Sequence, residues 1–512
     1  METLYPDLRP SDLHPLAGSV LTVDVSLSPA EVEGTSGEVH ITREAPDVVR
    51  VLKVHLLSDK SSQWDTLEYS ISAGTQKPAH FVLTAPTVDE PDHSILELRA
   101  NFYLNNRWCG EGVRNLDVRR DAGVSALARI PSPKVPEWRL GLTLEPDATP
   151  PDLIVRILKT THVGEYDWSC LSPHLNLDTP VDPVKRTMAL GDDAQTYVRN
   201  RFQPLAGKSL ANIDIADIEG IGQAIYDSTP EVFKDAYWAL WSAANEGHFP
   251  FDSIQIVTDE PYIPWELMRV YDAKRAPDVD PEFLAVRHCI GRWLAMDAAR
   301  LTQHISVNAT AVAASDYSQV DSIADKLPWA AEEKKLMMDT YRAEEVVLKS
   351  DPLLKFLKDG RVQALHFACH GKMSITNPLG SQLILEDTPN DLKPTMVNRP
   401  EVRRGLGSEH PMVFLNACEV GGGAASLTLV AGFPAAFLSA GASAVISPLW
   451  VVNDAHAKTI AATFYEQVLR KDARPLGEVL REVHSRWRDE KHLTYLAYVL
   501  YGDPLAAVAY RA

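Results

Sequence analysis

The chain has 512 residues, enough for about two to four domains, and its 45% hydrophobic and 23% charged residues are typical of a soluble globular protein. The net charge of −19 argues against general binding to nucleic-acid phosphates. The five cysteines are scattered and form no Cys-x-x-Cys pair, which argues against a disulfide framework or a zinc site. We therefore expect a cytoplasmic protein without a metal or a cofactor.

Residues 1–125 have the pattern of β-structure. Apolar residues at every second position of 20–27 alternate with polar ones, and similar short runs recur up to residue 119 between turn signals. This spacing predicts a β-sandwich of about seven strands. It contains no catalytic constellation, so we expect a binding or regulatory role, with a regulatory protein as its partner.

Residues 126–151 are predicted to be a stiff linker, because six prolines between 131 and 151 prevent a continuous helix or strand ladder. From residue 152 onward, short apolar runs alternate with segments of helical spacing. This alternation predicts an α/β fold, with a mostly parallel central sheet flanked by helices. The predicted strands are 153–159, 253–260, 305–314, 344–349, 362–369, 412–418 and 443–450, and the predicted helices include 215–244 and 330–342.

The segment from Val420 to Asn453 carries no charged residue and is long enough to span a bilayer. Pro434, Pro448 and several glycines interrupt it, so we interpret it as a buried helix followed by a buried strand. No membrane partner is expected.

Two of the predicted strands end in residues that could carry chemistry. One ends at His370-Gly371, and the other ends at Cys418, which is followed by Glu419 and a glycine-rich loop from Gly421. Functional groups of parallel sheets gather just beyond the carboxyl ends of the strands. An imidazole beside a thiol can take its proton and create the nucleophilic thiolate, and backbone N–H groups can stabilise the oxyanion that follows. Taken alone, either residue could also be structural.

Cys369 is the rival nucleophile. It is adjacent to His370 on the same strand, so it faces the opposite way and cannot easily use that imidazole as its base. We interpret it as a core residue. Cys109, Cys170 and Cys289 lack a neighbouring His-Gly or glycine-rich segment and are interpreted as structural.

The segments HFACHG (366–371), LNACEVG (415–421), 432–454 and AYVLYGDP (497–504) resemble the CHAT family of caspase-like peptidases, which are relatives of separase and the caspases. The segment IQIVTDEPYIPWELM (254–268) is similar to the family's Pro-Trp-Glu-Leu box, in which we take Trp265 and Glu266 as structural. The sequence departs from the family in its ACEVGGG loop and in having a β-sandwich instead of a helical repeat array.

The resemblance implies a caspase-like sheet of about six strands, with His370 as general base and Cys418 as nucleophile. It also implies an oxyanion hole formed by the backbones of Gly371 and Cys418. Residues 152–300 would then be a pseudo-caspase-like half, and 301–512 would be the catalytic domain. The implied function is a cysteine endopeptidase that cleaves a dedicated protein partner, in a context such as bacterial defence.

Many relatives cut after a charged residue, and four positions are candidates for substrate binding: Asp316, Glu419, Gly421 and Asp454. An acidic pocket would favour a basic residue at the scissile position. Asp454 is also expected to cap a helix that starts at residue 455. Part of the polar connection 372–411 is expected to be mobile and to gate the site.

Two other functions compete with the peptidase. A catalytically silent scaffold that keeps the fold is the alternative, and the presence of both His370 and Cys418 favours the enzyme over it. A nucleotide hydrolase is disfavoured, because no Lys-Ser/Thr follows the glycines at 421–423.

Overall fold

The structure is a computed structural model. It describes the backbone of residues 2–41, 45–58, 61–88, 92–105, 107–133, 143–144, 148–160, 162–177, 183–202, 215–294, 300–321, 323, 326–372, 380–419, 432–450 and 452–511. Within these ranges, the side chains of 107, 143–144, 183, 300–301 and 418–419 are not described.

The N-terminal region is a sheet that, in its described part, has ten strands in the order β7-β6-β5-β9-β10-β4-β1-β2-β8, with β3 beside β10. The two ends of this strand order lie close together in space. The Gln63 amide on β6, near one end, donates to the Val82 carbonyl on β8, at the other end, at 2.6 Å. The strands are β1 (Glu2–Pro10), β2 (Val20–Ser28), β3 (Thr35–Ser36), β4 (Val39–Ile41), β5 (Arg50–Ser58), β6 (Ser61–Ser70), β7 (Gly74–Lys77), β8 (Ala79–Thr84), β9 (His93–Leu104) and β10 (Arg107–Arg119).

The predicted alternation fits the observed burial on β2, where Leu21, Val23, Val25 and Leu27 are buried and the residues between them are not. Strand β1 was not predicted, because Pro6 and Pro10 interrupt its pattern. Its first residues pair with β4 and those from Tyr5 onward pair with β2, so the strand changes partner next to a proline that cannot donate to a ladder.

The central sheet has twelve strands among the described residues, in the order β14-β13-β12-β15-β18-β27-β26-β25-β23-β21-β22, with β24 beside β23. Most neighbours are parallel, and the strands are buried along most of their length, as expected for a sheet covered on both faces. The strands are β12 (Leu153–Lys159), β13 (Glu165–Leu171), β14 (Thr187–Ala189), β15 (Ser253–Thr258), β18 (Cys289–Leu294), β21 (Thr310–Ala314), β22 (Glu344–Glu345), β23 (Ala364–Lys372), β24 (Gln382–Leu383), β25 (Met412–Glu419), β26 (Ala444–Pro448) and β27 (Tyr498–Tyr501).

Three short strand pairs lie outside the two large sheets. They are β11 (Thr143–Leu144) with β19 (Arg300–Leu301), β16 (Arg269–Val270) with β17 (Glu282–Phe283), and β20 (His304–Val307) with β28 (Ala507–Tyr510).

Helices cover both faces of the central sheet. His366 on β23 contacts α6 and α11, whereas its neighbour Phe367 packs on Phe437 of α10 with ring centroids 5.9 Å apart, so these helices lie on opposite faces. The helices are α1 (Pro183–Arg186), α2 (Ala194–Phe202), α3 (Ile215–Asp227), α4 (Glu231–Asn245), α5 (Leu284–Arg287), α6 (Pro328–Tyr341), α7 (Ser350–Asp359), α8 (Pro394–Val397), α9 (Pro400–Glu409), α10 (Gly432–Ser439), α11 (Asp454–Val468), α12 (Leu476–Ser485) and α13 (Trp487–Glu490), with the 3₁₀ turns η3 (Trp265–Leu267) and η5 (Leu493–Leu496).

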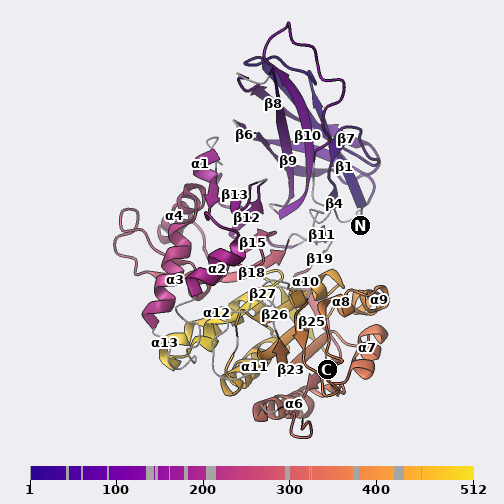
Figure 1. Ribbon diagram of the computed structural model, residues 1–512, viewed down its shortest axis with the longest axis vertical. Helices are drawn as coiled ribbons and strands as arrows, with labels where there is room; N and C mark the ends of the chain where they lie inside the picture. Colours follow the sequence, from indigo (N-terminus) through magenta and orange to yellow (C-terminus); the bar gives the residue numbers. More distant parts are fainter. Residues whose placement is uncertain are drawn as a thin grey trace.

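The strand β27 joins the two parts of the central sheet. It lies between β18, which precedes residue 300, and β26, which follows it. The expectation of about six strands was therefore too small, since the predicted halves 152–300 and 301–512 contribute to one continuous sheet. In Figure 1, the N-terminal sheet lies at one end of the molecule next to β12 and β13, where the Arg156 guanidinium donates to the Asn101 side chain of β9.

Two local predictions need correction. The predicted strand 305–314 is divided at Asn308 and Ala309 into β20 and β21, which belong to different sheets. The predicted strand 344–349 forms only the short β22.

The described part of the connection 372–411, from residue 380, contains β24, α8 and α9, and its apolar side chains, including Leu385 and Leu406, are buried. The mobility expected of part of this connection, and its gating of the site, stay predictions.

The apolar segment 420–453 contains a buried helix, α10, and a buried strand, β26, as predicted; residues 420–431 lie outside the described residues. No helix in the described ranges has both the length and the apolar composition needed to cross a membrane.

Candidate active site

The strand register brings the two predicted catalytic positions together. Strands β23 and β25 are parallel neighbours, and His370 is the direct partner of Cys418. Adjacent strands lie about 4.8 Å apart, and positions in register belong to the same face of a sheet. Positions 370 and 418 therefore share one face near the carboxyl ends of their strands. The side chain of Cys418 lies outside the described residues, so the two catalytic roles remain predictions.

His370 is held by Tyr317, a residue that sequence reasoning missed. The imidazole is 2% exposed and stacks on the Tyr317 ring with centroids 4.7 Å apart and planes inclined by 27°. The backbone N–H of His370 donates to the Tyr317 hydroxyl at 2.9 Å. Tyr317 lies three residues beyond the end of β21, the strand that pairs with β23, so the sheet topology brings it close to His370.

A buried polar network lies behind the predicted dyad on the same face. Glu333 of α6 is 2% exposed, and its carboxylate lies 2.7 Å from the His366 ring nitrogen and accepts from the Asn416 amide at 2.9 Å. Tyr498 of β27 donates to the Asn416 side-chain oxygen at 2.5 Å. These hydrogen bonds connect α6, β23, β25 and β27 next to positions 370 and 418. Because strand residues of one face alternate, His366 precedes His370, and Asn416 precedes Cys418, on that face.

The sequence carried a signal for part of this network. His366 and Asn416 are polar residues inside otherwise apolar strands, spaced four and two residues before the predicted dyad. That spacing places them on the dyad's face. Glu333 and Tyr498 could not be found in this way, because only the tertiary structure brings α6 and β27 to these strands.

The four other cysteines are poor candidates for the nucleophile. Burial raises the pKa of Cys369 to about 12, that of Cys109 to about 12 and that of Cys289 to about 11, and it raises the pKa of Cys170 as well. A thiol with such a pKa is protonated at neutral pH and reacts slowly. Cys369 is fully buried, which agrees with its interpretation as a core residue.

The candidate substrate residues that are described engage in local contacts. The carboxylate of Asp316 accepts the Ser318 N–H at 2.9 Å, and this hydrogen bond is the main reason that its pKa is lowered. Asp454 accepts the Trp329 N–H in the first turn of α6 at 3.0 Å, and partial burial raises its pKa to about 6. The binding roles of both residues remain predictions.

The expected capping role of Asp454 was wrong in detail. Helix α11 begins at Asp454 itself, and the Asn453 side chain is its cap, accepting the His456 N–H at 3.2 Å. Asp454 instead caps α6 from a neighbouring helix, where a carboxylate is favoured by the unpaired N–H groups of the first turn.

The other predicted site positions are described only in part. Gly371 lies in β23 as the register partner of Glu419, and the Glu419 side chain and the whole of Gly421 lie outside the described residues. Among the described residues, no three His, Cys, Asp or Glu side chains gather as a metal site would require.

Trp265 and Glu266 are buried in the core, in agreement with a structural role. The Trp265 ring meets Trp168 edge-on at a centroid distance of 5.2 Å. Glu266 forms an ion pair with the fully buried Arg292 of β18, whose guanidinium also donates to the Ile263 carbonyl at 2.9 Å. The Pro-Trp-Glu-Leu box therefore anchors η3 to the central sheet.

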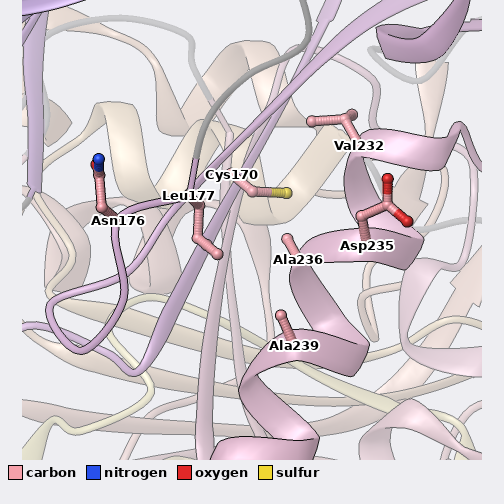
Figure 2. A pocket seen from close by; sticks show the side chains of 7 residues that line it. All are labelled: Cys170, Asn176, Leu177, Val232, Asp235, Ala236 and Ala239. Atoms are coloured by element: carbon pink, nitrogen blue, oxygen red, sulfur yellow. The ribbon is translucent and has the colours of Figure 1, made fainter. Parts of the chain in front are cut away.

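A pocket between the end of β13 and α4 offers no comparable chemistry. Figure 2 shows the Cys170 sulfur pointing toward α4, near Val232 and Ala236. None of the seven lining side chains is a histidine, and the acidic one, Asp235, pairs with Arg275. The pocket lacks a base for the Cys170 thiol.

Residues 261–503 match the family model of the CHAT domain. The match includes β23 and β25, with His370 and Cys418, and it confirms the resemblance seen in the sequence motifs.

The comparison with curated proteins found no match. Two solved structures of the Saccharomyces cerevisiae separase–securin complex are similar at 10% sequence identity, with TM-scores of 0.38 and 0.39. The similarity covers 68% and 73% of this chain but only 30% and 31% of those chains. A likeness this distant establishes neither a shared fold nor a shared function.

Proposed function

We propose that this protein is a cysteine endopeptidase in which His370 is the general base and Cys418 the nucleophile. The observation that carries the proposal is the register of β23 and β25 inside the residues that match the CHAT domain, since it makes the two positions direct neighbours on one face. A base within reach of a thiol is the arrangement that nucleophilic catalysis requires.

The proposed reaction begins with transfer of the Cys418 thiol proton to the His370 imidazole. The thiolate then attacks the scissile carbonyl carbon, and the imidazolium later returns the proton to the leaving amine, as in other enzymes that pair a nucleophile with a histidine. Water hydrolyses the resulting thioester and restores the free thiol. In this last step His370 takes a proton from the attacking water and passes it to the departing Cys418 sulfur, so protons and charge balance over the cycle.

The proposed oxyanion hole of Gly371 and Cys418 rests on the family resemblance. The N–H and C=O of His370 both point away from β25, because they bond to Tyr317 and to the Ile384 N–H. Successive residues of a strand point their backbone groups to alternate sides, so the N–H of Gly371 is directed toward β25, which carries Cys418. With His370 opposite Cys418 in a parallel ladder, that N–H is a donor to the Cys418 carbonyl, and an oxyanion would have to replace this carbonyl as its acceptor.

We further propose a protein substrate with a basic residue at the scissile position, held by acidic groups that include Asp316. The lowered pKa of Asp316 keeps its carboxylate charged at neutral pH, as a partner for Arg or Lys must be. Cleavage of peptides with Arg or Lys at this position, compared with otherwise identical Ala peptides, measures this preference. Equal cleavage of the two sets would contradict it.

The decisive experiment compares the wild-type chain with Cys418→Ala and Cys369→Ala. A peptide electrophile that labels thiol peptidases is added, the labelled residue is identified by mass spectrometry, and cleavage of candidate protein partners is followed in parallel. We expect label on Cys418, loss of label and cleavage in Cys418→Ala, and retention of both in Cys369→Ala. Cleavage that persists in Cys418→Ala would refute the proposal, and binding of a partner without cleavage or labelling would favour the scaffold alternative.

A further inference from the structure

The backbone at Tyr317 has an uncommon conformation. Its φ is +55°, in the left-handed region that glycine and asparagine tolerate and that a bulky aromatic residue rarely adopts. The residue is nonetheless fully buried. Residues in such conformations persist only where the surroundings hold them, and they are concentrated at functional sites.

Several contacts hold the Tyr317 backbone in this conformation. Its N–H donates to the Ser315 hydroxyl at 3.1 Å, and that hydroxyl donates to the Glu386 carboxylate at 2.9 Å. The Tyr317 carbonyl accepts from the Lys326 ammonium at 2.7 Å. The turn after β21 is therefore fixed on both sides of the tyrosine, and the ring direction is fixed with it.

Both the ring and the hydroxyl of Tyr317 contact His370 or the strand next to it. The ring stacks on the imidazole, while the hydroxyl accepts the His370 N–H and donates to the Ile384 carbonyl at 2.6 Å. The Ile384 N–H in turn donates to the His370 carbonyl at 2.8 Å. Tyr317 thereby closes a ring of hydrogen bonds around the backbone of His370 and covers one face of its imidazole.

A purely space-filling role does not require these features. Phenylalanine would fill the same volume, and glycine or asparagine would suit the backbone better. We propose that Tyr317 is a positioning residue that holds the imidazole of His370 toward position 418. This inference rests on the proposed peptidase function, because only a proton transfer between His370 and Cys418 would need the imidazole to be held in one orientation.

The test measures the rate at which iodoacetamide alkylates Cys418 between pH 5 and 10, with the product assigned by mass spectrometry and Cys418→Ala as background. A neighbouring imidazole should lower the apparent pKa of the thiol below the value of about 8.5 for a free cysteine. His370→Ala should move it back toward that value. Tyr317→Leu, which lacks both the ring and the hydroxyl, should move it in the same direction.

Tyr317→Phe keeps the ring and separates its effect from that of the hydroxyl. Loss of the hydrogen bonds should slow alkylation at pH 7 by about 3- to 10-fold. Tyr237→Phe is the matched control, because Tyr237 of α4 is also fully buried and its hydroxyl lies 2.9 Å from the His288 ring nitrogen, far from β23 along the central sheet. This control should alkylate at the wild-type rate.

The outcomes separate the two proposals. If His370→Ala leaves the thiol pKa unchanged, the proposed dyad fails. If His370→Ala shifts it but both Tyr317 variants behave like Tyr237→Phe, the dyad stands and the role of Tyr317 is overturned. Should Tyr317→Leu fail to fold, as judged by circular dichroism, Tyr317→Phe alone decides, and a wild-type profile in that variant overturns the inference.

Discussion

The two halves of the central sheet, β12 to β18 and β21 to β26, are both mostly parallel and buried, but they use their polar side chains differently. Beyond the end of β15, Glu260 is fully buried and accepts from the Tyr166 hydroxyl at 3.0 Å and the Tyr262 N–H at 2.7 Å, and Glu266 pairs with Arg292. At the ends of β23 and β25, the register instead places His370 beside Cys418.

The difference separates buried polar groups that hold the sheet together from those proposed to carry chemistry. In the first half, Glu260 meets hydrogen-bond donors and Glu266 meets an opposite charge, so these groups stabilise the strand ends. In the second half, the buried carboxylate of Glu333 lies behind the edge and holds His366 and Asn416, while the edge carries the imidazole and the thiol proposed for catalysis. Substitutions in the two halves should therefore affect different properties.

The largest effect is expected on catalysis in the second half. His370→Ala should lower the cleavage rate by about 10²- to 10⁴-fold, because removal of a general base has consequences of this size. The measurement is the initial rate of cleavage of a protein partner that the wild-type chain cleaves and Cys418→Ala does not. Tyr166→Phe, in the first half, should leave the rate per folded molecule unchanged, and a loss of similar size in this control would erase the distinction between the halves.

Arg292→Met in the first half should lower the free energy of unfolding by about 3–5 kcal/mol, because it leaves the buried Glu266 carboxylate without its partner. Urea denaturation followed by fluorescence measures this change. Lys355→Met removes an exposed ion pair with Asp359 and should leave the free energy of unfolding nearly unchanged. If the free energy of unfolding fell equally little in both variants, the buried Arg292–Glu266 pair would not be important for stability.

Glu333→Gln should lower the free energy of unfolding by about 1.5–3 kcal/mol, the usual worth of hydrogen bonds to a charged group. It should also slow alkylation of Cys418, since the network lies beneath the same strands. Glu332→Gln, at the exposed neighbouring position of α6, should affect neither quantity. If Glu333→Gln had the same stability and the same Cys418 alkylation rate as Glu332→Gln, the network would have no influence on the candidate site.

The smallest effect concerns the pH dependence contributed by Asp454. Its folded pKa of about 6 exceeds the unfolded value of about 3.9, so the folded chain binds more protons between these values and stability falls as the pH rises from about 4 to 6. Asp454→Asn should lack this fall and should be more stable than wild type above pH 6, by at most about 1 kcal/mol because water screens a half-exposed group.

Thermal melts across pH 2–8 measure the difference between Asp454→Asn and wild type. Asp316→Asn serves as the control of opposite sign, because the pKa of Asp316 is lowered in the folded chain. Its carboxylate stabilises the fold above the unfolded pKa, and this contribution is lost as the pH falls through the folded pKa. If stability relative to wild type changed with pH in the same direction in both variants, the opposite pKa shifts of Asp454 and Asp316 would be contradicted.

Much of the candidate site could be predicted from the sequence, because its signals are local. A strand that ends in His370-Gly371 and another that ends in Cys418 are visible as apolar runs closed by polar and glycine residues. Tyr317 was missed because its importance depends on a left-handed turn and on contacts with residues more than fifty positions away. Asp454 was misassigned because the helix that it caps is α6, far from it in the chain.

The sequence by itself determined the types of the elements, since hydrophobic periodicity reflects which side of each strand or helix is buried. It also marked His370 and Cys418 as unusual strand ends. Only the tertiary structure decided that β27 inserts between β18 and β26 and that Glu333 reaches His366 and Asn416. These arrangements depend on pairing between distant segments, for which periodicity along a single strand or helix carries no information.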